Sequence, residues 1–546
     1  MKKFFSRVCK YYLMVGLVFI ACSLSANDDL DKSDSVSVYH WIHLDPTDDQ
    51  VAGAGIYKAY QLLEGRPSTS VLVAVIDSGF DLDHEDLNNR FWMNKDEIPE
   101  NGIDDDKNGY VDDTFGWNFI GGSSENVVFD TYELTREYLR LKEKYKDVTE
   151  GRGDEYDYWL NVKENYEMGR TEAEIAMAKY RDLLNNIPRY YDLLENYLDV
   201  DSLSYELISA INSEDSVIVE AASLIGKLIR YFGDYTSVNS LIEAMKKGYS
   251  HYEYELEYGF NTEFDPRSVV DDNYLDKRER YYGNNRVNDY SGMMGGHGTH
   301  VAGIIAAIRD NDIGAIGIAD NVKIMALRTI PNGDERDKDV ANAIYYAVNN
   351  GAKIINMSFG KSYSPDRQIV EKAIRYAEKK DVLIVHAAGN DAENKDLKIN
   401  FPTRQFIKGR REASNMIEVA ANTKNFNENL PAKFTNYGKS TVDLFAPGVF
   451  IYSTIPEDNY KASSGTSMAS PVVAGVAALL RSYFPELTAR EIKEVLLQSS
   501  VSYEGDVYLP GTKDKVPFSD LTLSGGIVNA YEAVRIAMNR ISLDIR

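Results

Sequence analysis

The 546-residue chain has 44% apolar and 27% charged residues, a globular balance that suits one large domain with an insertion or two to three domains. Its formal net charge of −25 argues against nucleic acid as a partner, because an acidic surface repels phosphate backbones. The only cysteines, Cys9 and Cys22, lie near the N-terminus, which excludes a disulfide framework and cysteine-based metal chemistry further along.

The N-terminus predicts export. Basic residues precede an apolar run at 11–21 that is too short to cross a bilayer comfortably, so residues 1–22 are interpreted as a signal peptide. Cys22 follows Phe-Ile-Ala, which loosely resembles a bacterial lipobox and predicts membrane attachment through a lipid on Cys22; the alternative is a plain cleavage site with an incidental cysteine. Polar residues 23–36 predict a flexible tether. We therefore expect a cell-envelope or outer-membrane lipoprotein, or otherwise a secreted protein.

Short, continuous runs of β-branched and other apolar residues predict strands that are buried on both faces. They lie at 71–76, 322–327, 352–357, 382–387 and 416–421. Helical patterns alternate with them, at 55–64, 298–308, 337–350, 365–380, 467–483 and 488–498. This alternation predicts an α/β fold with a mostly parallel sheet and helices on both of its faces.

The stretch 122–288 breaks this rhythm, because it is rich in Tyr, Glu and Lys and lacks buried-strand runs. Residues 171–174 (Thr-Glu-Ala-Glu) have the pattern of a capping box, and the helical spacing that follows is expected to end at Pro188. We therefore predict an all-helical insertion at 122–288 that separates two parts of one domain, residues 37–121 and 289–546.

A carboxylate, Asp77, ends the first predicted strand, in the segment Ile-Asp-Ser-Gly. A carboxylate at the end of a buried strand is costly unless it is hydrogen-bonded or paired with a cation. Asp77 could orient a histidine and stabilise its protonated form, or it could simply cap the following turn.

His297 lies in Gly-Gly-His-Gly-Thr-His-Val-Ala-Gly (295–303), at the start of a predicted helix of small residues. Glycines on both sides let backbone and substrate approach closely, so His297 is a candidate general base. Two histidines three positions apart also suggest a metal site, but no acidic or cysteine partner has a metalloprotease spacing. His300 is instead expected to face inward as a structural residue.

Ser467 lies in Ser-Gly-Thr-Ser-Met-Ala-Ser-Pro (464–471), ahead of a predicted apolar helix. A serine at this position presents its hydroxyl beside free backbone N–H groups, and the positive end of the helix favours developing negative charge. That arrangement suits a nucleophile, although Ser464 or Ser467 could instead serve as an N-cap.

Taken together and in this order, the three segments closely resemble the active-site blocks of the subtilisin-like serine proteases. The resemblance covers roughly residues 37–121 and 289–535 and implies a subtilisin-like three-layer sandwich. It implies that Asp77 orients His297 and that His297 takes a proton from Ser467. Ser467 would then attack the scissile carbonyl and form an acyl-enzyme intermediate.

The resemblance extends to the pocket around these residues. Asn390, which follows the predicted strand 382–387, would hold the oxyanion together with the backbone N–H of Ser467. The two walls of the primary specificity pocket are implied at Ser358, Phe359 and Gly360 and at Ala387, Ala388 and Gly389. Extended polypeptide substrates would pair with the backbone of these segments as an added strand.

An acidic loop at 104–113 carries oxygen-bearing side chains at alternate positions, with Gly109 available for a sharp turn. This follows the logic of an EF-hand, but no Glu stands at the twelfth position. The subtilisin-like family has similar loops that bind calcium, which implies a structural Ca²⁺ site; the alternative is a solvated acidic turn. The candidate ligands are Asp104, Asp106, Asn108, Tyr110, Asp112 and Asp113.

Two functions remain open at this point. All four active-site positions are intact, which favours an exported serine endopeptidase. The alternative is a catalytically silent, surface-binding lipoprotein that keeps the fold. The insertion begins and ends close to the active-site segments in sequence, so we expect it to restrict access to the cleft or to recruit substrate.

Overall fold

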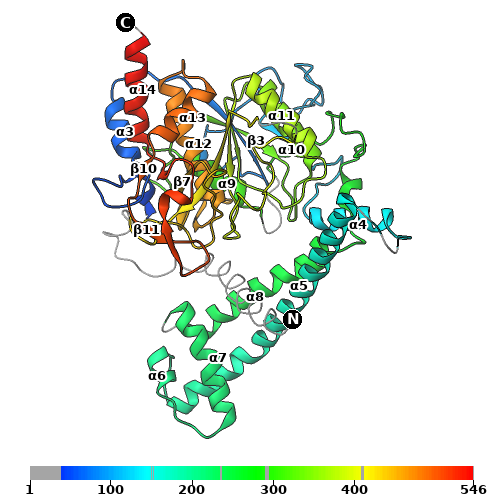
Figure 1. The fold of residues 1–546 in the computed structure, drawn as a ribbon, viewed down its shortest axis with the longest axis vertical. Helices are drawn as coiled ribbons and strands as arrows, with labels where there is room; N and C mark the ends of the chain where they lie inside the picture. The colour runs from blue at the N-terminus through cyan, green and yellow to red at the C-terminus, as the bar shows by residue number, and fades with distance from the viewer. Residues whose placement is uncertain are drawn as a thin grey trace. The chain divides into compact units, whose positions relative to one another are not determined.

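The computed structural model describes residues 39–148, 151, 153–233, 236–288, 294–407 and 411–544. The predicted signal peptide, its Cys22 and the tether at 23–36 lie outside the described residues. Within the described residues the chain forms two compact units. We call residues 39–133 with 264–544 the sheet unit and residues 134–263 the helical unit (Figure 1).

A nine-stranded sheet forms the centre of the sheet unit, in the order β10-β13-β7-β6-β5-β4-β1-β3-β2. All neighbouring strands pair in parallel except β10 with β13, which confirms the predicted α/β class. The strands are β1 (Val71–Asp77), β2 (Gly116–Asn118), β3 (Val322–Arg328), β4 (Ile354–Met357), β5 (Leu383–Ala387), β6 (Met416–Asn422), β7 (Leu444–Pro447), β10 (Val501–Ser502) and β13 (Gly526–Ile527).

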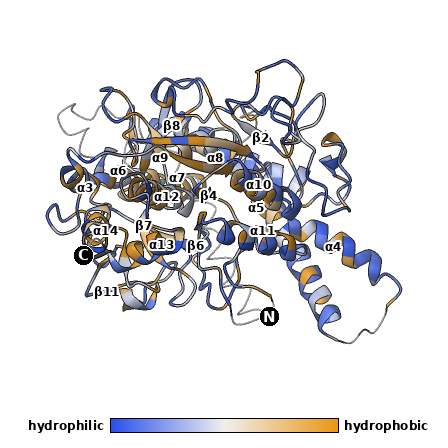
Figure 2. Ribbon diagram, turned by 90° about the horizontal axis from the view of Figure 1, so that it is seen from above, coloured by the Kyte–Doolittle hydropathy of each residue, from blue (hydrophilic) through white to orange (hydrophobic). Residues whose placement is uncertain are grey.

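Helices cover both faces of this sheet and complete the three layers. Alternate residues of β1 point to opposite faces: Val73 and Val75 join the core that contains α9 and α12, whereas Ala74 and Ile76 join the core that contains α10 and α11. The strands are largely hydrophobic in Figure 2, as burial on both faces requires. The helices are α3 (Ile56–Leu63), α9 (His297–Ala306), α10 (Asp337–Asn349), α11 (Arg367–Lys379), α12 (Thr466–Tyr483), α13 (Ala489–Gln498) and α14 (Ala530–Asp544).

Short elements complete the sheet unit. Two hairpins form separate two-stranded sheets, β8 (Ile451–Ile455) with β9 (Asn459–Ser463) and β11 (Asp506–Tyr508) with β12 (Lys515–Pro517). Four 3₁₀ turns are η1 (Trp41–His43), η2 (Glu85–Leu87), η4 (Pro266–Val269) and η5 (Phe518–Asp520). None of the described helices has both the length and the hydrophobicity that crossing a membrane requires.

The helical unit packs amphipathic helices around a core of its own. Its elements are α4 (Glu133–Lys144), α5 (Asp154–Leu198), α6 (Tyr205–Ser209), α7 (Ser216–Phe232), α8 (Val238–Tyr254) and the π-helical turn η3 (Glu255–Gly259). Figure 2 shows hydrophobic and hydrophilic residues alternating along α4, as expected of a helix with one buried face.

The predicted helix boundaries at Thr171 and Pro188 are wrong, because α5 runs through both. Thr171 does not cap a helix; its hydroxyl donates to the carbonyl of Glu167 one turn earlier, at 2.7 Å. Pro188 costs the helix one backbone hydrogen bond. Ile187 and Tyr191 on either side of it are buried in the core of the helical unit, and this packing holds the helix together across the proline.

The helical unit is narrower than the predicted 122–288, because the flanking segments pack as part of the sheet unit. Asn118 and Asn284 exchange two backbone hydrogen bonds, at 2.8 and 3.0 Å. Arg267 makes a buried ion pair with Asp339 of α10, at 2.7 Å. Inside the helical unit, the hydroxyl of Thr135 donates to the carbonyl of Gly259 at 2.7 Å, so the two ends of that unit also meet.

Candidate active site

Asp77 and His297 are in direct contact. Asp77 is the last residue of β1 and is 2% exposed, and its Oδ1 lies 2.7 Å from Nδ1 of His297 at the start of α9. The same Oδ1 accepts the backbone N–H of Ser78 at 2.8 Å. The first turn of α9 comes close to the loop after β1, since a Cβ on Gly298 would lie only 2.3 Å from the carbonyl oxygen of Gly79. A glycine after His297 is therefore required for this approach.

The environment of His297 favours its protonated form. Burial by itself would lower the pKa of the imidazole, but the charge of Asp77 and its hydrogen bond outweigh burial and raise that pKa above its ordinary value. The hydrogen bond at Nδ1 leaves Nε2 to face outward, and the side chain is 16% exposed. His297 is thus an oriented base with one ring nitrogen directed away from Asp77.

Ser467 stands in the first turn of α12, where backbone N–H groups lack helical partners. Its hydroxyl donates to the carbonyl of Ser358, at 2.9 Å. Neither Ser464 nor Ser467 caps the helix, because Gly465 is the N-cap residue and Oγ of Ser464 accepts the backbone N–H of Phe450 instead. The hydroxyl of Ser467 is therefore not committed to a capping role.

Asn390 is fixed against the start of α12. Its Oδ1 accepts both the backbone N–H of Thr466, at 2.9 Å, and the hydroxyl of Thr466, at 3.0 Å. This orientation leaves Nδ2 as a donor. A Cβ on Gly465 would lie 3.7 Å from Nδ2 of Asn390 and 3.6 Å from the backbone nitrogen of Ser467. The two donors that the sequence implied for an oxyanion therefore flank the same small space.

The two implied pocket walls follow adjacent parallel strands. Ser358–Gly360 continue from the end of β4, and Ala388–Gly389 continue from the end of β5. Ala387 is the last residue of β5 and is buried. The hydroxyl of Ser358 donates to the carbonyl of Ser467 at 2.9 Å, so the first wall contacts the helix that carries the candidate nucleophile.

A buried histidine that the sequence did not single out ties the two walls together. His386 precedes Ala387 in β5; its Nε2 lies 2.8 Å from the carbonyl of Phe359, and its Nδ1 lies 3.0 Å from Oε2 of Glu418. Burial would raise the pKa of Glu418, but the charges of Lys395 and His386 outweigh burial and lower the pKa to about 2. Both ring nitrogens therefore lie within hydrogen-bonding distance of an oxygen, so the ring links β5 to the first wall and to Glu418 of β6.

His300 faces inward, as the sequence predicted. It is 1% exposed and its Nε2 lies 2.9 Å from the carbonyl of Lys461 in β9. Burial lowers its pKa to about 3, so the ring is neutral.

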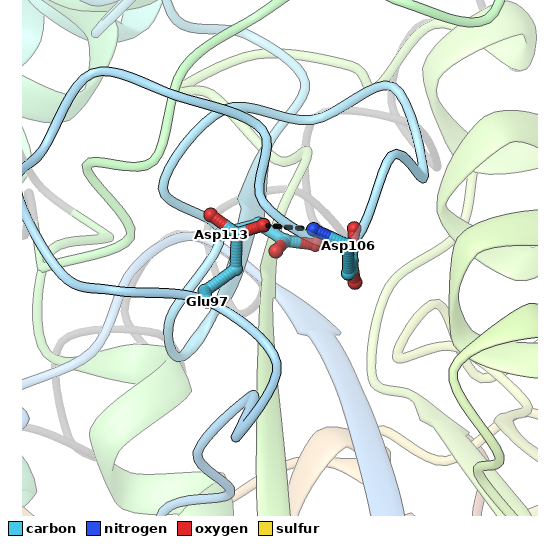
Figure 3. A group of neighbouring side chains, drawn as sticks. All are labelled: Glu97, Asp106 and Asp113. Carbon is cyan, nitrogen blue, oxygen red and sulfur yellow. Dashed lines mark hydrogen bonds between the residues drawn. The ribbon is translucent and has the colours of Figure 1, made fainter.

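The acidic loop brings together only part of the predicted ligand set. Carboxylate oxygens of Asp106 and Asp113 lie within 4.8 Å of one another and of Glu97, which the sequence did not indicate (Figure 3). Asn108 donates its amide to both aspartates, at 2.9 Å each. Burial, reinforced by the charge of Asp106, raises the pKa of Asp113 to about 6 despite hydrogen bonds that lower it.

The other predicted ligands hold the loop itself. The carboxylate of Asp104 accepts the backbone N–H groups of Asn108 and Gly109, and that of Asp112 accepts those of Asn101 and Gly102. The side chain of Tyr110 is buried in the aromatic core of the sheet unit. Glu97 comes from a turn earlier in the chain. Its position seven residues before Asp104 is the feature of the sequence that could have marked it as a further ligand.

Comparison with known proteins identifies the family. A profile of the subtilase family (Peptidase S8) matches residues 68–521. Thermitase from Thermoactinomyces vulgaris is 38% identical over 241 residues, which cover 44% of this chain and 75% of thermitase. Subtilisin DY from Bacillus licheniformis is 36% identical over 220 residues, which cover 40% of this chain and 74% of that protein. The chain therefore belongs to the subtilase family of serine peptidases.

Proposed function

We propose that the protein is an exported serine endopeptidase that hydrolyses extended polypeptides through Asp77, His297 and Ser467. The observation that carries this proposal is the 2.7 Å contact between Asp77 and His297, which leaves Nε2 of the ring free for a substrate-side proton. A buried carboxylate in this position holds the required tautomer and stabilises the imidazolium that forms. A silent binding protein has no use for such an arrangement.

In the proposed reaction, the hydroxyl of Ser467 leaves the carbonyl of Ser358 and donates to Nε2 of His297 when substrate binds. Oγ then attacks the scissile carbonyl carbon while His297 takes the proton. The oxyanion is held by Nδ2 of Asn390 and the backbone N–H of Ser467. His297 next protonates the leaving amine, and water, deprotonated by the same ring, releases the acyl group.

Digestion of a peptide library by the mature protein tests this function. An endopeptidase produces internal cuts in peptides longer than about six residues, whereas an exopeptidase releases single residues or dipeptides. Mass spectrometry of the products and of the mature N-terminus in the same sample also reports whether residues 1–22 are removed and whether Cys22 carries a lipid. Intact peptides after prolonged incubation with calcium would favour the silent surface-binding lipoprotein.

Two variants of Asn390 separate its two contacts. Asn390→Asp keeps an oxygen that can accept the N–H of Thr466 but removes the Nδ2 donor, so we expect kcat to fall by about 100–1000-fold with KM and the melting temperature little changed. Asn390→Leu also removes the acceptor at the start of α12, so we expect the same loss of kcat plus a stability loss of about 1 kcal/mol. An unchanged kcat in Asn390→Asp would contradict the oxyanion role.

We propose a structural Ca²⁺ site at the acidic loop, and the residues present fit that ion. Glu97, Asp106 and Asp113 supply hard oxygen ligands, and a divalent cation would relieve the repulsion that contributes to the raised pKa of Asp113. The amides of Asn94 and Asn108 both donate to Asp106 and Asp113, and turning them over would present oxygens to the ion.

We therefore expect Ca²⁺ to raise the melting temperature relative to EDTA, by an amount equivalent to about 2.7 kcal/mol when calcium is present at 100 times its Kd. Asp113→Asn should abolish most of this increase, since it removes one of the charged ligands. Asp96→Asn is the matched control, because Asp96 is an exposed carboxylate next to Glu97 that lies outside the cluster. Differential scanning calorimetry measures the shift, and an equal shift in all three proteins would place the calcium elsewhere.

A further inference from the structure

The residue that follows the first pocket wall is a buried lysine. Lys361 comes directly after Gly360 and is only 5% exposed. Its ammonium group contacts the carboxylate of Glu133 at 2.7 Å, the carbonyl of Glu335 at 2.7 Å and the carboxylate of Asp337 at 2.9 Å. An ammonium group has three N–H donors, so each donor can be paired with one of these oxygens. The end of the wall is therefore held by buried ionic contacts that are costly to break.

Glu133 reaches Lys361 from the segment that leads into the helical unit. It is buried and is the first residue of α4, and the chain continues from it into that unit. Its backbone N–H donates to Oδ2 of Asp334, at 2.8 Å. Earlier in the same segment, Asp130 makes a bidentate ion pair with Arg336, with nitrogen–oxygen distances of 2.7 and 2.9 Å. The entry to the helical unit is thus anchored at two points just ahead of α10.

The segment that leaves the helical unit is anchored to the same region. The carboxylate of Asp265 accepts from the guanidinium group of Arg336, at 2.9 Å. Arg267 makes its buried ion pair with Asp339 in the first turn of α10, at 2.7 Å. The first residue of α10 is also one of the partners of Lys361. One connected set of buried ion pairs therefore joins both ends of the helical unit to the residue that follows the wall.

We propose that Glu133 is a positioning residue for peptide binding: through Lys361 it holds the wall Ser358–Gly360 in the extended form that pairs with substrate. This inference rests on the proposed function, because it takes that wall as a strand to which the substrate adds. The entry to the helical unit therefore sets how tightly the active site binds peptides that run along the wall. A reagent that reacts with Ser467 but has no peptide part depends little on Glu133.

Kinetics with and without a peptide part test this role. The peptide substrate is a succinyl-Ala-Ala-Pro-X p-nitroanilide, where X is whichever of alanine, leucine and phenylalanine the wild type cleaves best. Glu133→Ala removes an acceptor of Lys361, so we expect KM for this substrate to rise by about 3–30-fold with kcat little changed. The rate constant for labelling of Ser467 by a fluorophosphonate probe should stay at the wild-type value.

Two further variants separate the contact from a general loss of stability. Glu133→Gln keeps an oxygen that can accept from Lys361, and Asp337 remains as the counter-ion, so KM should stay close to that of the wild type. Glu137→Ala is the matched control, because it removes another buried carboxylate of α4, one that pairs with Arg140 at 2.7 Å. An unchanged KM in folded Glu133→Ala, or an equal rise in Glu137→Ala, would overturn the proposal.

Hydrogen exchange in the wild type tests the same link if Glu133→Ala does not fold. A succinyl-Ala-Ala-Pro-X diphenyl phosphonate attaches to Ser467 and lays its peptide part along the wall, whereas the fluorophosphonate adduct has no peptide part. The peptide adduct should slow amide exchange at residues 130–134 as well as in the wall, and it should leave α7 unchanged. Slower exchange in the wall alone would show that the wall and Glu133 are not linked.

The wild type distinguishes failure of this inference from failure of the proposed function. If the wild type is labelled by the fluorophosphonate probe and cleaves the peptide substrate, but KM does not respond to Glu133→Ala, only the role of Glu133 is wrong. If the wild type is neither labelled nor active on any of the three substrates, the peptidase proposal itself fails and the Glu133 proposal fails with it.

Discussion

Replacing Ser467 by alanine is expected to lower kcat by about a million-fold, which is the loss that removing the nucleophile causes in this family. Alanine deletes the only oxygen that could form the proposed acyl-enzyme. The contacts that fix the start of α12, from Asn390 to Thr466, do not involve the Ser467 hydroxyl, so the melting temperature should change little. The residual rate would come from substrate positioning and the oxyanion donors.

A fluorophosphonate probe should label the wild type at Ser467, and the label should be absent from Ser467→Ala. Ser502→Ala serves as the control, because Ser502 is an exposed serine in the edge strand β10. Tryptic mapping of the labelled protein identifies the modified residue. Label at a different serine would remove Ser467 from the mechanism, and no label in any protein with calcium present would favour the silent lipoprotein.

Replacing Asp77 by asparagine is expected to lower kcat by about ten-thousand-fold, because an amide can stabilise the wrong tautomer of His297 and cannot stabilise the imidazolium. The acid limb of the pH–rate profile should also move. Asp77 raises the pKa of His297, and only the neutral ring can act as a base, so wild-type activity rises with pH through that raised pKa. Without the carboxylate, this limb should shift to lower pH.

The stabilisation of the fold by the Asp77–His297 pair decreases with rising pH, whereas the activity increases. A histidine whose pKa is raised on folding contributes stability that is fully present below its unfolded pKa and is lost as pH rises through the folded pKa. The difference in unfolding free energy between wild type and Asp77→Asn that arises from His297 should therefore shrink from acidic to alkaline pH. Asp83→Asn, which removes an exposed charge from the same loop, is the control for both measurements. If the acid limbs of the pH–rate profiles of the wild type and Asp77→Asn lie at the same pH, Asp77 does not raise the pKa of His297.

The sheet could be predicted because burial on both faces leaves an unmistakable composition. β1, β3 and β6 each appear in the sequence as an uninterrupted apolar run. β2 and β13 are only three and two residues long, too short to show any period. Local propensity predicts a helix end at Pro188, whereas α5 continues, because propensity carries no information about the burial of Ile187 and Tyr191 in a common core.

In the candidate site, too, residues in characteristic short segments could be predicted, and residues that act through contacts with other segments could not. Asp77, His297 and Ser467 lie in short segments whose residue types and order are informative by themselves. His386 matters only through contacts with two other segments of the chain, the carbonyl of Phe359 and the carboxylate of Glu418. A histidine in the apolar run at 382–387 was a usable sign that something polar had to satisfy it.

The paired ends of the helical unit bear on the order of folding. Asn118 and Asn284 are 166 positions apart, so pairing them in an unfolded chain means closing a very long loop. If the helical unit forms first, the contact between Thr135 and Gly259 already joins its ends, and only residues 119–134 and 260–283 remain to be closed. That roughly fourfold shorter loop lowers the entropy cost of closure by about 1 kcal/mol. Early formation of the insertion would thus speed assembly of the parallel sheet rather than delay it.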